Sequence, residues 1–175
     1  MTGSVELVTP AFRVRKETKR IILHASHTAP RCGEGEWFYR WLYSRGREMG
    51  LLQCGYHVAI DAEGRARDCR PHTTIGNHCH RNNEDSIGIV LEGGLLGMAP
   101  GDKATDPPVP LYGDTFTEDQ RQTLIAVVLL MRARYEIEDL PVVTHSPGVI
   151  PPKYHGHLCP SFKDQDRWTT PGLLL

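Results

Sequence analysis

The sequence lacks any apolar run close to the ~20 residues that a membrane-spanning helix requires. Its first residues, MTGSVELVTP, also lack the basic stretch followed by an apolar core that is typical of an export signal. We therefore expect no insertion into a membrane, and a protein that is made in the cytoplasm without a signal peptide. A strong charge of either sign is missing too, because the formal net charge is −1. This balance gives no reason to expect a nucleic acid as partner.

A complete set of disulfide pairs is also missing. The chain has five cysteines, an odd number, in a sequence without an export signal: Cys32, Cys54, Cys69, Cys79 and Cys159. Such a set does not predict a disulfide framework. We expect thiols, one of which is available to a metal.

Length and composition are those of one ordinary globular domain. A chain of 175 residues can bury a core of its own, and 39% hydrophobic and 23% charged residues are common values. The sequence contains no internal repeat and no linker. We therefore expect a single domain over residues 1–175, with its motif-bearing core at residues 20–168.

Apolar and β-branched runs predict strands in the main part of the chain, and the run at residues 5–8 fits a further short strand. The main strands are expected at residues 20–24, 56–60, 65–69, 86–92 and 142–144. The second and third of these are joined by a short turn and predict a hairpin. The segment at residues 95–116 is rich in glycine, proline and aspartate, and we predict a loop there.

Two helices are predicted between the strands. One spans about residues 36–49, with Gly50 as its C-cap. The other begins at a capping box formed by Thr117 and Gln120 and runs to about Tyr135. Strands that alternate with helices predict an α/β fold, a mixed central β-sheet with helices packed on it.

Histidines and a cysteine follow two of the predicted strand ends. His24 ends the first strand, His145 follows the last, and Cys159 lies in the loop that begins there, together with His155 and His157. A single histidine is more often a surface residue than a ligand, so the combination carries the argument. Zinc accepts imidazole nitrogen and thiolate together, and three protein ligands leave a fourth position for water. The sequence therefore predicts a zinc site at strand ends.

Four separated motifs carry a resemblance to a known family. They are LHASHT around His24, GYHVAI around Tyr56, the run from Asn77 to Gly94, and the segment 144–162, which begins TH and ends CPSF. In this order they resemble the zinc-dependent N-acetylmuramoyl-L-alanine amidases of the phage T7 lysozyme type, a family that includes the peptidoglycan recognition proteins. The resemblance covers about four-fifths of the chain and implies a single amidase catalytic domain.

The resemblance also implies roles for individual residues. It implies one zinc ion per chain, held by His24, His145 and Cys159. Tyr56 would be a catalytic residue beside the metal-bound water and the substrate carbonyl, and His78 would bind substrate in the cleft. Zinc lowers the pKa of bound water to about 7 and polarises the carbonyl, which suits amide hydrolysis at neutral pH.

One position departs from the family pattern. Members frequently have a lysine two residues before the cysteine ligand, where this chain has His157. A histidine can donate a hydrogen bond there and can pass a proton to the leaving amine, with a different pH dependence. We rank His157 first as the catalytic residue and Lys153, in the same loop, second.

The activity implied by the resemblance is hydrolysis of the amide bond between N-acetylmuramic acid and L-alanine in peptidoglycan. A compact catalytic domain without a signal peptide resembles the endolysin of a phage. Such a protein acts on the cell wall, in the periplasm, after the inner membrane is permeabilised. We expect a monomer, and a bacterial enzyme would have the same sequence requirements.

Two alternatives come from other classes. The chain could be a catalytically silent peptidoglycan-binding module, although such modules typically lack the cysteine or the tyrosine that this chain keeps. It could also be a cysteine peptidase that uses Cys54 with His145. Nucleophilic cysteines are commonly activated at a helix N-terminus, whereas Cys54 follows a predicted helix.

Overall fold

The chain forms a mixed sheet in a computed structural model that describes residues 12–34, 36–101, 106–149, 158–170 and 172–174. The strand order is β3-β2-β4-β1-β7. Its strands are β1 (Arg20–Ala25), β2 (Val58–Ile60), β3 (Ala66–Asp68), β4 (Ser86–Leu91) and β7 (Val142–Thr144). The neighbours β2, β4, β1 and β7 are parallel, and β3 is antiparallel to β2. The predicted α/β fold with a mixed sheet is confirmed.

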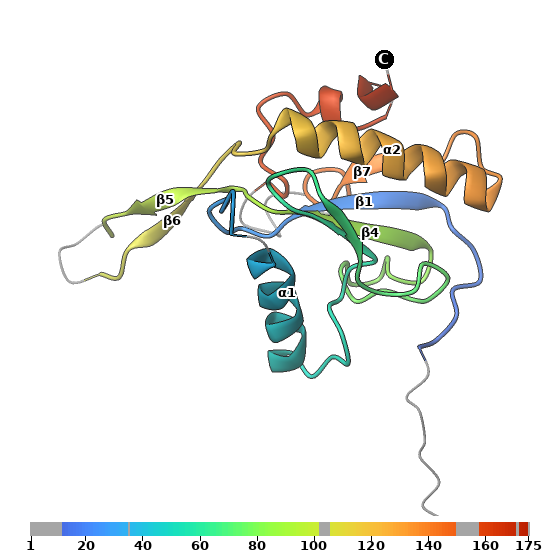
Figure 1. Cartoon of the computed structure of the whole chain (residues 1–175), viewed down its shortest axis with the longest axis horizontal. Helices are drawn as coiled ribbons and strands as arrows, with labels where there is room; N and C mark the ends of the chain where they lie inside the picture. The colour runs from blue at the N-terminus through green and yellow to red at the C-terminus, as the bar shows by residue number, and fades with distance from the viewer. Residues whose placement is uncertain (1–11, 35, 102–105, 150–157, 171, 175) are drawn as a thin grey trace, which may run out of the picture.

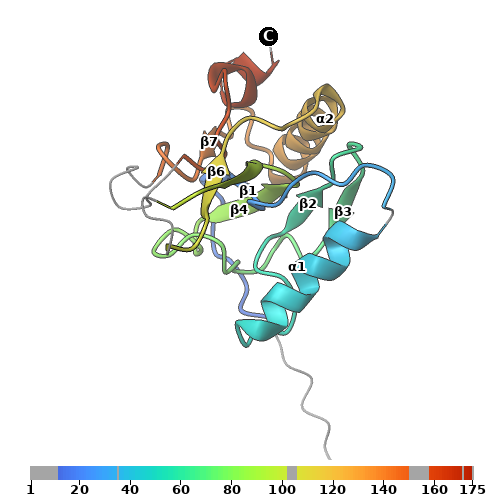
Figure 2. The same ribbon diagram turned by 90° about the vertical axis from the view of Figure 1, so that its left-hand side faces the viewer.

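Two helices cover opposite faces of this sheet (Figures 1 and 2). Helix α2 (Glu118–Tyr135) buries Leu124, Val128 and Met131 against the larger apolar cluster of the core. Helix α1 (Trp37–Glu48) packs through Phe38, Tyr39 and Leu42 against the other face. Strands β1 and β4 therefore have helices or loops on both sides, which explains why they are apolar almost throughout.

Alternation along β1 decides which way its histidine points. Ile21 and Leu23 belong to the cluster under α2. Successive side chains of a strand point to opposite faces, so His24 lies on the face that α1 covers. Its partner in β4, Val90, packs in the α1 cluster, which agrees with this placement.

The predicted capping box at the start of α2 is present. The Thr117 hydroxyl accepts a hydrogen bond from the backbone N–H of Gln120, and the Gln120 side chain accepts one from the backbone N–H of Thr117. The Gln120 amide also donates to the carbonyl oxygens of Ile60 and Glu92. The helix is thus fixed to the carboxyl ends of β2 and β4.

The prediction of a loop at residues 95–116 is wrong at residues 95–99 and 109–112. Strands β5 (Leu95–Ala99) and β6 (Val109–Tyr112) pair there as an antiparallel hairpin that extends away from the body of the molecule (Figure 1). The hairpin buries little of its side-chain surface, so its composition is not that of a core strand, and Pro110 is tolerated because a two-stranded ribbon has only edges.

Other parts of the chain complete the fold. Two short 3-10 helices follow β7: η1 (Asp166–Trp168) and η2 (Gly172–Leu174). Trp168 stacks on Phe162 with ring centroids 4.5 Å apart, which packs this segment on the core. The strand expected at residues 5–8 lies outside the described residues. Among the residues described, no helix is both long and apolar enough to span a membrane.

Candidate metal centre and cleft

The register of two parallel strands brings His24 and His145 together. Leu23 of β1 is paired with Thr144 of β7, so the next residue of each strand is a histidine at the same level. The backbone N–H of His145 donates to the carbonyl oxygen of Leu23, 2.9 Å away, which continues the ladder to the histidine itself. The two imidazole centroids are 4.6 Å apart.

Cys159 reaches the same point from the loop after β7. It forms a two-way bridge with Ser146, with N···O distances of 3.0 and 2.9 Å, directly after His145. The ligand atoms of His24, His145 and Cys159 all lie within 4.8 Å of one another. The three residues are 2%, 8% and 3% exposed. Within the described ranges, no other group of three histidine, cysteine or acidic side chains is arranged in this way.

The setting of Cys159 is that of a thiol that needs a cation to ionise. Burial raises the pKa of Cys159 to about 12, against a smaller lowering by the Ala25 N–H, whose nitrogen lies 3.5 Å from the Sγ atom. A divalent metal reverses this balance, because a coordinating thiol is deprotonated. The donor set of two imidazoles and one thiol is typical of zinc.

Tyr56 and His78 surround the His24 ring. The ring centroids of both residues lie 5.1 Å from that of His24, and His78 Nδ1 is 3.0 Å from His24 Nε2. Burial raises the pKa of Tyr56, so its hydroxyl keeps its proton at neutral pH. Burial, and then the nearby His57, lower the pKa of His78, whose ring is therefore neutral.

Two glycines leave the space that the His78 ring fills. A Cβ atom at Gly88 in β4 would lie 2.4 Å from His78 Cγ, and one at Gly76 would lie 2.4 Å from His78 Cδ2. Real Cβ atoms do not approach so closely, so any larger residue would displace the ring. The Asn83 side chain also accepts hydrogen bonds from the backbone N–H groups of His78 and Cys79, which holds the loop in place.

A cavity of about 280 Å³ opens beside these residues. Tyr56, His78 and Ser26 line one part of it, and α1 supplies the opposite wall through Trp41, Leu42 and Arg45. The sequence predicts this helix, but it does not predict that the helix forms a wall beside the candidate metal ligands. The sequence signal for this wall is the helical spacing of its apolar residues, and that spacing does not identify the cavity that a helix lines.

Two other histidines and the remaining candidates lie outside this group of three. His57 is fully buried and bonded to the backbone of β4, and His72 pairs with Asp68 away from the centre. Cys54 lies near Cys69, and the thiol that lies with His145 is Cys159, so the geometry does not support a Cys54–His145 dyad. The candidates Lys153, His155 and His157 lie outside the described residues.

Comparisons with known proteins show the family. The family profile described as N-acetylmuramoyl-L-alanine amidase matches residues 14–162. The endolysin of Escherichia phage T7 is 31% identical over 157 residues, which is 90% of this chain and 89% of the phage protein. The endolysin of Enterobacteria phage T3 has the same identity and coverage.

Solved structures share the fold at lower identity. The N-acetylmuramoyl-L-alanine amidase LysC from Clostridium intestinale superposes with a TM-score of 0.60 and 18% identity, covering 89% of each chain. Drosophila PGRP-LB superposes with a TM-score of 0.62 and 18% identity, covering 86% of this chain and 79% of the other.

Proposed function

The chain belongs to the N-acetylmuramoyl-L-alanine amidase family, and we propose that it cleaves the bond between N-acetylmuramic acid and L-alanine with one zinc ion held by His24, His145 and Cys159. Membership of this family supports amidase activity. The phage relatives are endolysins, which supports peptidoglycan as the substrate and the cell wall as the place of action. The scissile bond, the metal and the residue roles are the proposal.

The donor chemistry supports zinc in particular. Two nitrogen donors and one thiolate give the coordination of a catalytic site, in which a fourth position stays open. His24 Nε2 lies 3.0 Å from His78 Nδ1, and His24, His145 and Cys159 each offer one donor atom to the group. When bound, zinc supplies a Lewis acid and a water of lowered pKa at neutral pH.

Tyr56 is suited to the charge that develops on the substrate. Its ring lies against His24 at the edge of the cavity, and its raised pKa keeps a phenolic proton available. A neutral donor aimed at the scissile carbonyl stabilises the oxyanion more than the ground state. Single donors of this kind contribute about 3 kcal/mol to transition-state stabilisation.

His78 is proposed to bind substrate and to orient a ligand. It lines the cavity and also contacts His24, so one ring can meet both the substrate and the metal centre. Partners of ligating histidines commonly fix the tautomer and the ring direction. The expected role of His157, with Lys153 as the alternative, is to donate to the carbonyl or the leaving amine, and it rests on the sequence alone.

One observation carries the proposal: three zinc-type donors converge at parallel strand ends beside a tyrosine and a cavity. The test is digestion of purified sacculi, with mass spectrometry of the soluble products. The proposal expects stem peptides with a free N-terminal L-alanine. Glycan fragments with intact peptides, or binding without release, would contradict it, and binding alone would indicate the silent module.

A matched pair of tyrosine variants tests whether the Tyr56 hydroxyl takes part in catalysis. Tyr56→Phe is expected to lower kcat by about 10²-fold, the effect of removing one oxyanion donor. Tyr43→Phe removes a hydroxyl from α1 at a hollow that lies apart from the cavity, and it is expected to keep wild-type kcat. Equal activity of the two variants would remove Tyr56 from the mechanism.

A further inference from the structure

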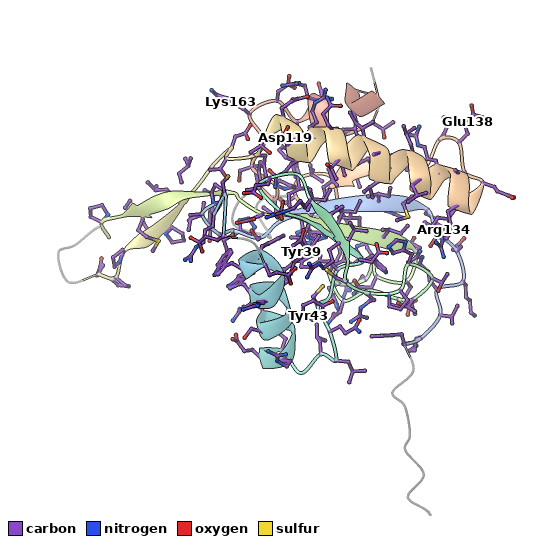
Figure 3. The ribbon with its side chains drawn as sticks, in the orientation of Figure 1. Tyr39, Tyr43, Asp119, Arg134, Glu138 and Lys163 are labelled. Atoms are coloured by element: carbon purple, nitrogen blue, oxygen red, sulfur yellow. The ribbon has the colours of Figure 1, made fainter. Side chains whose placement is uncertain are left out.

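Two buried cysteines lie behind the cleft, outside the metal centre. Cys54 precedes β2 and Cys69 directly follows β3, and they are 1% and 3% exposed. Both belong to the apolar cluster under α1. Tyr39 is part of the same cluster and Tyr43 lines a hollow with Cys69; Figure 3 labels both on the side of α1 that faces the sheet.

The two thiols are neighbours in this cluster. Each acts on the other: the pKa of Cys54 is lowered and that of Cys69 is raised, chiefly by the partner thiol. Backbone carbonyls hold the sulfurs in place, because Cys54 Sγ is 3.4 Å from the Tyr56 oxygen and Cys69 Sγ is 3.6 Å from the Arg67 oxygen. A disulfide needs an S–S distance of about 2.05 Å, so the two side chains would have to approach to that distance to form the bond.

We propose that Cys54 and Cys69 are a site of intramolecular disulfide formation. Cys54 lines the cleft cavity and Cys69 lines a hollow on the other side, so a small disulfide can reach the pair. The Cys54 thiolate attacks one sulfur of a disulfide RSSR and releases RSH. The Cys69 thiolate then attacks Cys54 and releases a second RSH. Two protein thiols and RSSR thus give one protein disulfide and two RSH, which take up both protons.

The bond would connect the segment before Tyr56 to β3. It would close a short loop of the chain, residues 54–69, and so restrict the unfolded state. An amidase that is made in a reducing compartment and acts in an oxidising one meets this chemistry on release. That consequence rests on the proposed function, whereas the bond itself does not.

The experiment treats purified, zinc-equilibrated protein with oxidised glutathione. Cys32 is exposed and is replaced by serine in every protein compared, so that four thiols remain. We expect the thiol count to fall from four to two, the intact mass to fall by two hydrogen atoms, and the peptide map to link Cys54 to Cys69. The melting temperature should rise by about 6–12 °C, and dithiothreitol should reverse the change.

Matched cysteine variants separate this pair from the other buried thiols. Cys79→Ser removes a buried cysteine outside the pair and should keep the mass loss and the thermal shift. Cys54→Ala and Cys69→Ala should each abolish both. A stable glutathione adduct, a link to Cys79 or Cys159, or four thiols that persist would overturn the proposal. None of these readouts uses substrate, so a disulfide without sacculus cleavage would refute the amidase function only.

Discussion

Replacing His57 with glutamine should remove most of the acid sensitivity that this residue contributes to folding. His57 is 0% exposed, and its Nδ1 accepts the Gly88 N–H at 2.9 Å. Its Nε2 therefore carries the proton and donates to the carbonyl oxygen of Thr74 at 2.9 Å. These bonds fit the neutral ring, and burial lowers the pKa of His57 from 6.5 to about 4.

Whether acid stabilises or destabilises the fold depends on which state, folded or unfolded, binds the proton more readily. Between the unfolded pKa of 6.5 and the folded pKa of about 4, the unfolded chain binds a proton that the folded chain rejects. Stability from this residue is present above pH 6.5 and is lost as the pH falls toward 4. The difference between the two pKa values corresponds to about 3 kcal/mol, of which about 2 kcal/mol is lost between about pH 7 and about pH 4.5.

The assay is urea unfolding of the wild type and of His57→Gln with chelator present, so that metal release is common to both proteins. The variant should be less stable at neutral pH but should lose about 2 kcal/mol less on acidification. His72→Gln, which changes a histidine paired with surface Asp68, serves as the matched control and should follow the wild type. Parallel profiles for the wild type and His57→Gln would refute the reasoning.

Three further changes test other parts of the structure. Gly88→Ala places a Cβ against the His78 ring. It should destabilise folding by about 1–3 kcal/mol and weaken zinc binding in a chelator competition. Unchanged zinc affinity would show that the space left by Gly88 for the His78 ring does not matter to the metal centre. Thr117→Ala removes the N-cap of α2; it should lower stability by about 1 kcal/mol in thermal unfolding and leave kcat unchanged. His157→Ala should lower kcat more than Lys153→Ala and should alter the limb of the pH–rate profile near about 6.5; the reverse order would favour the lysine.

Elements with strong local signals could be predicted from the sequence. The apolar run at residues 86–92 became β4, and the capping box at Thr117 and Gln120 set the start of α2. In each case, local chemistry and the tertiary fold favour the same conformation. The β5–β6 hairpin was missed because few of its side chains pack on the core, so the apolar alternation on which strand prediction depends is weak there.

The three candidate metal ligands were predicted from motifs, whereas their surroundings were not. The positions of His24 and His145 at predicted strand ends indicated that they could lie close together, and the register of β1 with β7 places them side by side. The wall formed by α1, the glycine seat of His78 and the Cys54–Cys69 contact depend on where distant segments pack. Hydrophobic period and residue spacing carry no information on such pairings, so only the folded chain reveals them.

Zinc content measured together with activity tests the central claim most directly. Purified protein should contain about one zinc per chain, as a single site with three protein ligands predicts. Chelation should abolish release of peptides that begin with L-alanine, added zinc should restore it, and Cys159→Ser should bind little zinc. Full activity in protein freed of metal, or zinc retained by Cys159→Ser at the wild-type level, would contradict the assignment of His24, His145 and Cys159 as the catalytic metal site.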